Sequence, residues 1–296
     1  MTMEYTGGFQ GILNKLYEFW LNFGCLAIPS AQTEISSPIF HPVSFFNLIT
    51  DKNINLMYLQ PHVASREFDN MRFGFQNYTF LKFQVVIKNR LENPQKIVLD
   101  SLNYLGLNTK KNNVVFKNED YENFIFRFNT CGYKTLFNGV SVVKFHYVQN
   151  IGPHNFENTP IIILYNIDKI LTILQDKNNL WDTKWGKNSE NQDVFYSDLM
   201  LNSEKENYDF VKNKTTNNIL LEQLNNFKIM AQELVDNDII VPAYTTILKA
   251  KYCLDILCLR NFIMYNDKLD HSKALRNIVD LCCEKYLLKY FKEKNG

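Results

Sequence analysis

The chain has 296 residues, and its 32 Lys and Arg almost balance its 31 Asp and Glu, which leaves a net charge of +1. A protein that binds nucleic acid along a basic face normally carries a larger positive excess, so charge alone indicates no such partner. The content of 46% hydrophobic residues excludes a disordered chain and allows a large core.

Composition is skewed towards residues with A+T-rich codons, since 37 Asn and 26 Lys stand against 7 Ala, 11 Gly and 6 Arg. We interpret this skew as the mutational bias of an A+T-rich, reduced genome, which erodes motifs for reasons unrelated to function.

No apolar run is long enough for a membrane span, and Glu4 precedes the first Lys without a long apolar stretch, so a cytoplasmic protein is expected. The six Cys form no CxxC pair and predict reduced core thiols rather than a metal site.

Hydrophobic spacing predicts the elements of the first third of the chain. Two segments repeat apolar residues every three or four positions and end at a glycine, which predicts helices over 9–23 and 98–105. Three β-rich runs predict strands at 26–28, 57–60 and 80–88. The last run is apolar almost throughout, so it is predicted to be a central strand buried on both faces.

A β-hairpin is the clearest local signal, because Asn138-Gly139 lies between two β-rich runs and favours a two-residue type I′ turn. An unbroken ladder from that turn pairs Leu136 with Ser141 and Lys134 with Val143. One face of the hairpin is therefore predicted to carry Lys134, Leu136, Ser141, Val143 and Phe145.

The second half of the chain becomes helical. Residues 159–174 are predicted to start as a strand and to continue as a helix from about Asn166. The segment 176–217 is rich in polar residues, and strand and helix patterns fade in it, which predicts a surface connection or insertion. Three helices are predicted after it, at 219–234, 242–263 and 269–291.

This order of elements, strands first and helices later, predicts an α+β fold with a helical bundle at its end. We divide the chain into a core at 1–175, a polar connection at 176–217 that returns to the core, and a C-terminal helical domain at 218–296. The sequence contains no GxGxxG, GxxxxGK[ST], HExxH or G-x-S-x-G motif, and its five His are isolated. Without a resemblance to a known family, the sequence therefore predicts only an α+β protein. An unrelated small-molecule-binding protein remains an alternative hypothesis.

Seven short motifs follow one another over about residues 6 to 290. In chain order they are Phe9-Gln-Gly11 with Phe19-Trp20 and Gly24-Cys25, Glu34 with His41-Pro42, Tyr58-x-Gln60-Pro61 with Phe83-Gln-Val-Val-Ile-Lys88, Ser101-Leu102 with Leu105-Gly106, Asn138-Gly139 with Phe145-x-Tyr147-x-Gln149, Asp182 and Trp185 with Asp193-Val-Phe195, and Pro242-Ala-Tyr244 with Leu248-Lys-Ala250. Together they resemble the α subunit of the bacterial two-subunit glycyl-tRNA synthetase, a class II aminoacyl-tRNA synthetase. Their common order and spacing argue against chance.

The resemblance implies a fold, a reaction and a partner. The fold is a class II synthetase-type antiparallel sheet flanked by helices, followed by a C-terminal helical region. The reaction joins glycine to ATP, presented as its Mg²⁺ complex, to form glycyl-adenylate and then passes glycine to tRNA(Gly), with the protein supplying position and charge neutralisation. The partner is a β subunit that makes most of the tRNA contact, usually in an α2β2 tetramer, which accounts for the missing basic excess.

This sequence departs from the family pattern where phosphate contacts are expected. After Gln60-Pro61 the family has Ser-Arg-Arg-Pro at the start of the motif 2 loop, whereas this chain has the residues 62–65, His-Val-Ala-Ser. Arg66 and Arg72 follow in the same loop, and either of them could act as the substitute cation. In motif 3 the family pattern Gly-Leu-Glu-Arg is replaced by Asn-Ile-Asp168-Lys169, and Lys does not reproduce the planar, bidentate grip of Arg on phosphate.

Further departures fall where the glycine pocket is expected. Two acidic family positions are Lys134 and Ser141 here, a Gln is Lys144, and a carboxylate before motif 3 is Ile162. Because glycine carries an ammonium group, the loss of carboxylates predicts weaker binding of glycine.

The resemblance assigns candidate site residues in three groups. The catalytic candidates are Gln60, Asp168 and Lys169; the ATP-binding candidates are Arg66, Arg72 and Lys169; the glycine-binding candidates are Glu34, Gln84, Asn138 and Ser141. Structural alternatives stay open for three of the retained positions: Asn138 for the turn, Gln84 for pairing within the sheet, and His41-Pro42 for a turn.

Two functional hypotheses follow. The first is a working glycine–tRNA ligase α subunit of low specific activity, and we take it as the prediction. The second is a catalytically degenerate structural subunit that retains the fold and the partner interface. The second is favoured by the loss of phosphate-contact residues beside a retained apolar scaffold, although the composition bias depletes Arg and Gly throughout the chain.

Overall fold

The computed structural model describes residues 7–63, 78–88 and 91–291. Its main sheet contains β1 (Leu26–Ala27), β2 (Leu56–Val63), β3 (Thr79–Ile87), β4 (Val114–Asn118), β5 (Tyr121–Asn123), β6 (Phe128–Phe137), β7 (Val140–Ile151), β8 (His154–Asn155) and β9 (Ile161–Asn166). The strand order is β1-β2-β3-β9-β7-β6-β4, with β5 beside β6 and β8 beside β7. Every strand pair except β1 with β2 is antiparallel, which confirms the predicted α+β sheet.

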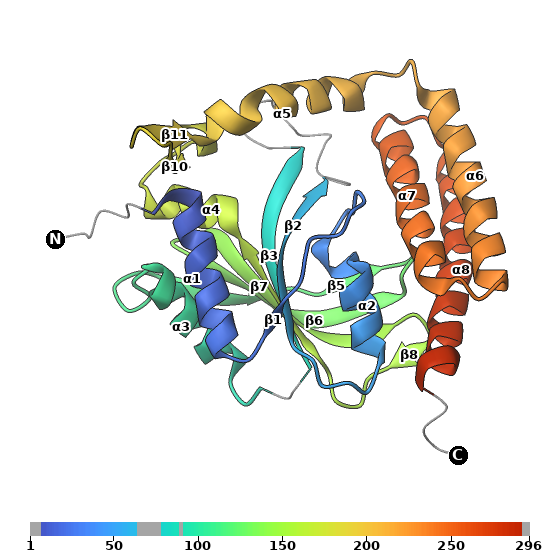
Figure 1. Ribbon diagram of the computed structural model, residues 1–296, viewed down its shortest axis with the longest axis horizontal. Helices are drawn as coiled ribbons and strands as arrows, with labels where there is room; N and C mark the ends of the chain where they lie inside the picture. Colours follow the sequence, from blue (N-terminus) through green and yellow to red (C-terminus); the bar gives the residue numbers. More distant parts are fainter. Residues whose placement is uncertain (1–6, 64–77, 89–90, 292–296) are drawn as a thin grey trace.

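Helices cover both faces of this sheet (Figure 1). One face packs against α1 (Gly8–Asn22), α3 (Pro94–Leu105) and α4 (Ile167–Leu174). The other face packs against α2 (Pro42–Ile49) and the C-terminal helices α6 (Asn217–Asp236), α7 (Ile240–Leu259) and α8 (Tyr265–Phe291). The predicted helical region after the sheet is therefore confirmed, and it encloses one face of the sheet.

Local sequence explains where the first helices begin and end. In α1 the residues that recur every three or four positions, Phe9, Ile12, Leu16 and Trp20, are the buried ones. α3 starts four residues earlier than predicted, because the Asn93 side chain accepts a hydrogen bond from the backbone N–H of Lys96 and caps the helix. It ends before Gly106, which caps it in the left-handed conformation with a φ of 107°. Glycine adopts this conformation at little cost.

β3 is the central strand that the apolar run predicts. It lies between β2 and β9, and Phe83, Val85 and Ile87 point into the core beneath α1 and α3. The alternate residues Gln84 and Val86 are also buried, on the opposite face. Burial on both faces is thus confirmed for the second half of the strand.

The hairpin of β6 and β7 has the predicted turn but a different register. Asn138 and Gly139 both have positive φ, 48° and 84°, as a type I′ turn requires. Leu136 pairs with Ser141 as predicted, but Thr135 then pairs with Val143, so that Val142 is an extra residue in a β-bulge.

The bulge changes the predicted face of the hairpin. Lys134 pairs with Lys144 rather than with Val143, so the predicted pair is wrong. Lys134 and Ser141 still share a face, whereas Val143 and Phe145 lie in the core on the other side of the sheet. Lys144 and His146 take their places.

The segment 176–217 is more regular than its sequence predicts. It forms a short 3-10 turn (Leu180–Asp182), the two-stranded hairpin of β10 (Lys184–Lys187) and β11 (Asp193–Phe195), and the helix α5 (Tyr196–Lys212). The weak strand and helix patterns of this sequence therefore do not reflect a lack of regular structure, and its role as a polar connection at 176–217 stays a prediction. Figure 1 shows α5 running across the top of the sheet from this hairpin to α6.

An aromatic cluster attaches the C-terminal helices to the sheet. Tyr244 of α7 stacks on Phe45 of α2 with ring centroids 4.5 Å apart, and its hydroxyl donates a hydrogen bond to the Phe40 carbonyl at 3.0 Å. Phe40 in turn stacks on Phe126 at 4.1 Å. The Pro242-Ala-Tyr244 motif therefore has a packing role, which fits a fully buried tyrosine.

Candidate functional site

A cavity of about 440 Å³ lies between the sheet and the C-terminal helices. Its floor is formed by β2, β3, β7 and β9, and its walls by the β4–β5 connection, residues 36–39 and the facing sides of α7 and α8. This volume is in the range of cavities that bind small molecules.

The floor of the cavity carries polar side chains on strands that otherwise bury apolar ones. Lys82 and Gln84 point into it from β3, and Lys144 and His146 from β7. Gln84 is 1% exposed and donates a hydrogen bond from Nε2 to the Tyr58 hydroxyl at 2.6 Å. Buried polar groups of this kind cost free energy unless they are paired, so their concentration at one place indicates a functional site.

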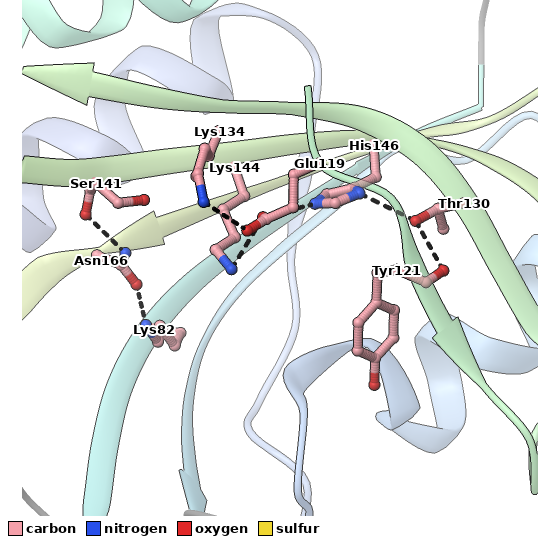
Figure 2. A network of polar contacts seen from close by, with 9 residues as sticks. All are labelled: Lys82, Glu119, Tyr121, Thr130, Lys134, Ser141, Lys144, His146 and Asn166. Atoms are coloured by element: carbon pink, nitrogen blue, oxygen red, sulfur yellow. Dashed lines mark hydrogen bonds and ion pairs between the residues drawn. The ribbon is translucent and has the colours of Figure 1, made fainter. Parts of the chain in front are cut away.

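Glu119 is the centre of a charged network in the cavity wall (Figure 2). Its Oε2 lies 2.9 Å from Lys144 Nζ, and its Oε1 lies 3.5 Å from Lys134 Nζ. The Glu119 backbone N–H donates to the Gly132 carbonyl at 2.9 Å, which fixes the connection between β4 and β5 against β6. Burial opposes ionisation of Glu119, but the two lysines outweigh it and hold the pKa of the carboxyl below its ordinary value.

His146 completes this network without adding charge. Its Nε2 lies 3.8 Å from Glu119 Oε2, and its Nδ1 is 3.0 Å from the Thr130 hydroxyl. Burial lowers the pKa of His146, so the ring is neutral at neutral pH. The Glu119 carboxylate therefore has two lysines as its charged partners, and the ring adds no third positive charge.

A second polar group surrounds Lys82, where β3 meets the end of β9 (Figure 2). Lys82 Nζ donates a hydrogen bond to Asn166 Oδ1, and Asn166 Nδ2 donates to the Ser141 carbonyl at 2.8 Å. The same ammonium lies 5.6 Å from the centroid of the Phe80 ring, which faces the cavity. Burial and the Lys82 charge lower the pKa of His62 to about 3, so its ring, stacked on Phe80 at 5.3 Å, is a neutral surface.

Asp168 is the second residue of α4 and lies near this lysine. Burial raises the pKa of Asp168 to about 6, although Lys82 and a hydrogen bond from the Leu81 backbone both oppose the shift.

A family model for the glycyl-tRNA synthetase alpha subunit matches residues 9–290. The chain belongs to the glycyl-tRNA synthetase α-subunit family. Among solved structures it is similar to two of pyrrolysyl-tRNA synthetase from Desulfitobacterium hafniense, with TM-scores of 0.40 and 0.39 and sequence identities of 11% and 10%. Each similarity covers 60% of this chain and 72% of that chain.

Three of the residues expected from the glycyl-tRNA synthetase α-subunit resemblance lie at or beside the cavity. Gln84 lines it, and Asp168 and Ser141 contact the group around Lys82, Ser141 through its carbonyl. The alternative that Gln84 pairs within the sheet also holds, because its amide bonds to Tyr58 on the neighbouring strand β2.

Four other expected residues lie apart from the cavity lining. Gln60 is buried, and its amide group accepts from the Ala31 N–H at 2.7 Å and donates to the Pro61 carbonyl at 2.8 Å. Glu34 and Lys169 are exposed. Asn138 is exposed in the hairpin turn, where its side chain bonds to Asn112 and to the Asn113 N–H, which supports the turn alternative. The expected roles of Gln60, Glu34, Lys169 and Asn138 stay predictions.

Arg66 and Arg72 lie outside the described residues. His41 is buried, and its Nε2 lies 2.9 Å from the Pro29 carbonyl, which fits the predicted structural role.

Sequence reasoning missed Phe80, Lys82 and Glu119. A signal for Phe80 and Lys82 exists: they alternate with Gln84 on one face of an apolar central strand, and only the cavity accounts for polar residues there. Glu119 has no local signal, because the long-range pairing of β4 with β6 brings it to the network.

Other kinds of site find no support in the part of the chain that the structure describes. There, no group of three or more His, Cys, Asp or Glu is arranged to hold a metal ion. None of the helices in the same ranges is long and apolar enough to cross a membrane.

Proposed function

We propose that this chain is the α subunit of a glycine–tRNA ligase, and that it activates glycine with MgATP in the cavity on the sheet. The observation that carries the proposal is the family match over residues 9–290 combined with the polar floor of the cavity at the middle of the sheet. Formation of glycyl-adenylate needs two substrates held in line and cations against the phosphates.

The side of the cavity around Phe80 is suited to ATP. Phe80 offers an aromatic surface for a base, and neutral His62 stacks behind it. Lys82 places an ammonium group beside that ring, where it can neutralise phosphate charge. We assign Lys82 the role that the sequence predicts for Lys169, whereas Arg66 and Arg72 keep the roles predicted from the sequence.

The side around Glu119 is suited to the ammonium group of glycine, but only weakly. Glu119 presents a carboxylate on the face where the sequence predicts the loss of two. The same carboxylate is shared with Lys134 and Lys144, so little of its charge is left for a third cation. This arrangement supports a working enzyme that binds glycine weakly and has low specific activity.

A catalytically degenerate subunit is the second candidate, and one observation favours it. The Glu119 carboxylate in the wall that should receive an ammonium group is already paired with Lys134 and Lys144. A subunit of this kind would keep the packing of α7 through Tyr244 and its partner interface while losing affinity for glycine.

The proposal includes a partner and a location. Most contact with tRNA(Gly) belongs to a β subunit, usually in an α2β2 assembly, and the complex works in the cytoplasm. The net charge of +1 supports this division, because a chain that bound tRNA alone would need a basic face.

Charging of tRNA(Gly) by the chain and its β subunit tests the proposal. A working α subunit gives ATP-dependent glycyl-tRNA, and none forms with alanine or serine in place of glycine. A complex that assembles and binds tRNA(Gly) but leaves it uncharged would establish the degenerate subunit instead.

A further inference from the structure

The first residues of β3 lack a strand on one side. β3 pairs with β9 only from Lys82 to Ile87, because β9 ends at Asn166 and the chain turns into α4. On that side, backbone N–H groups before Lys82 have no acceptor on another strand of the described chain, and a buried N–H without an acceptor is costly.

Carboxylates take the place of the missing strand. Glu204 of α5 accepts the Tyr78 N–H with Oε2 at 2.6 Å, and both of its oxygens accept the Thr79 N–H, at 3.1 and 3.2 Å. A second carboxyl group, Asp168 of α4, lies near the Leu81 backbone, and that contact acts to lower its pKa. Glu204 therefore supplies the acceptors that β9 does not provide for the Tyr78 and Thr79 N–H groups.

Glu204 is an unusual residue on its helix. α5 is polar and mostly exposed, and its buried residues are Tyr196, Glu204 and Val211. Glu204 itself is 4% exposed, whereas acidic residues are rarely buried without a specific partner. Its burial is explained by the contact with β3, 125 and 126 residues away in the sequence.

The start of β3 is also held by α7. The Tyr78 hydroxyl lies 2.9 Å from the Tyr252 hydroxyl, within hydrogen-bond distance. Two helices from different parts of the chain therefore hold Tyr78 and Thr79, the two residues that come directly before Phe80.

We propose that Glu204 is a positioning residue for the nucleotide side of the cavity. By holding Tyr78 and Thr79 it fixes the start of β3, and with it the Phe80 ring and the Lys82 ammonium group on the cavity wall. The inference rests on the proposed function, because it takes ATP as the ligand of that wall. A misplacement of about 1 Å in groups that position a substrate is costly, and here it would fall on the groups that hold ATP.

The test compares Glu204→Gln with Glu206→Gln, a matched change at an exposed position of the same helix. Hydrogen exchange of the peptide 78–88 is measured with and without ATP on the full chain, and the KM values for ATP and glycine are measured by glycine-dependent ATP–pyrophosphate exchange. E204Q should speed exchange at Tyr78 and Thr79, abolish the protection by ATP and raise the KM for ATP about tenfold, with kcat and the KM for glycine little changed. E206Q should change none of these. If E204Q does not fold, Glu204→Asp keeps the charge but withdraws it by one methylene, and it should shift the same quantities.

Separate outcomes would overturn the inference and the proposed function. Faster hydrogen exchange in E204Q with an unchanged KM for ATP would show that Glu204 only holds the strand. ATP that protects no part of 78–88 in the wild-type chain would also overturn the inference. Protection by ATP without any glycine-dependent exchange would leave the role of Glu204 standing and contradict the proposed function.

Discussion

Lys82 lies where three side chains of the candidate site meet: the Phe80 ring, the Asn166 amide and the Asp168 carboxyl. It occupies an inward position of a central strand, and a lysine is seldom placed there for stability alone because burying an ammonium group is costly. At the residue scale, Lys82 is therefore the side chain on which the proposed ATP site depends most.

Lys82→Met tests this assignment. Loss of the ammonium group should raise the KM for ATP about tenfold or more, because a charged hydrogen bond to phosphate is lost. Pyrophosphate exchange at varied ATP concentrations measures the effect, with Lys177→Met on an exposed turn as the control. A larger effect of Lys169→Met than of Lys82→Met would restore the prediction made from the sequence.

Asp168 gives a pH dependence of stability. Its pKa is about 6 in the folded chain against an ordinary 3.8, so the folded state binds more protons than the unfolded state between about pH 4 and 6. Its contribution to stability is therefore present below this window and is lost as the pH rises through it. Asp168→Asn removes this titration. The free energy of unfolding of the variant minus that of the wild type should therefore rise by on the order of 2–3 kcal/mol from pH 4 to pH 8. Urea denaturation at the two pH values measures the difference, and a constant difference would contradict the account.

At the scale of elements, Arg260 joins three helices at one point. The guanidinium group at the end of α7 donates to the Val211 and Phe210 carbonyls at the end of α5, and to the Thr216 and Asn217 side chains at the start of α6. It is 4% exposed. The planar group meets four acceptors in different directions, which an ammonium group cannot do.

Arg260→Lys should therefore lower the free energy of unfolding by about 2–3 kcal/mol, because several buried acceptors lose their donors. Arg276→Lys is the control, since Arg276 contacts the Phe124 ring from a half-buried position. Chemical denaturation of both variants measures the costs. Equal costs for the two variants would show that Arg260 has no special role in holding α5 and α6.

Elements with a strong apolar period could be predicted from the sequence, and elements held by single polar contacts could not. The helix over 9–23 and the strand over 80–88 follow from spacing alone, and the structure confirms them. The bulge at Val142 could not be predicted, because Val142 and Val143 are both apolar and buried. The alternation of apolar and polar residues along the strand therefore does not reveal the extra residue. α5 is missed because it is a polar helix with three buried residues. Glu119 lies at the site because β4 pairs with the distant strand β6, and no local sequence pattern predicts that pairing.

At the scale of the whole molecule, one sheet separates two kinds of packing. The face beneath α1, α3 and α4 is an apolar core, and the face beneath the C-terminal helices holds both an apolar core and the cavity. The helical tail therefore closes the candidate site as well as stabilising the fold, since α7 and α8 form part of the cavity wall. The cavity is therefore enclosed between the sheet and helices of the same chain.

Glycine-dependent ATP–pyrophosphate exchange tests the central claim most directly. The folded chain, with and without its β subunit, is incubated with ATP, labelled pyrophosphate and either glycine or alanine. The account predicts exchange that requires glycine, at a low specific activity and with a high KM for glycine, because Glu119 is shared with two lysines. Absence of exchange from folded protein in both preparations would contradict it.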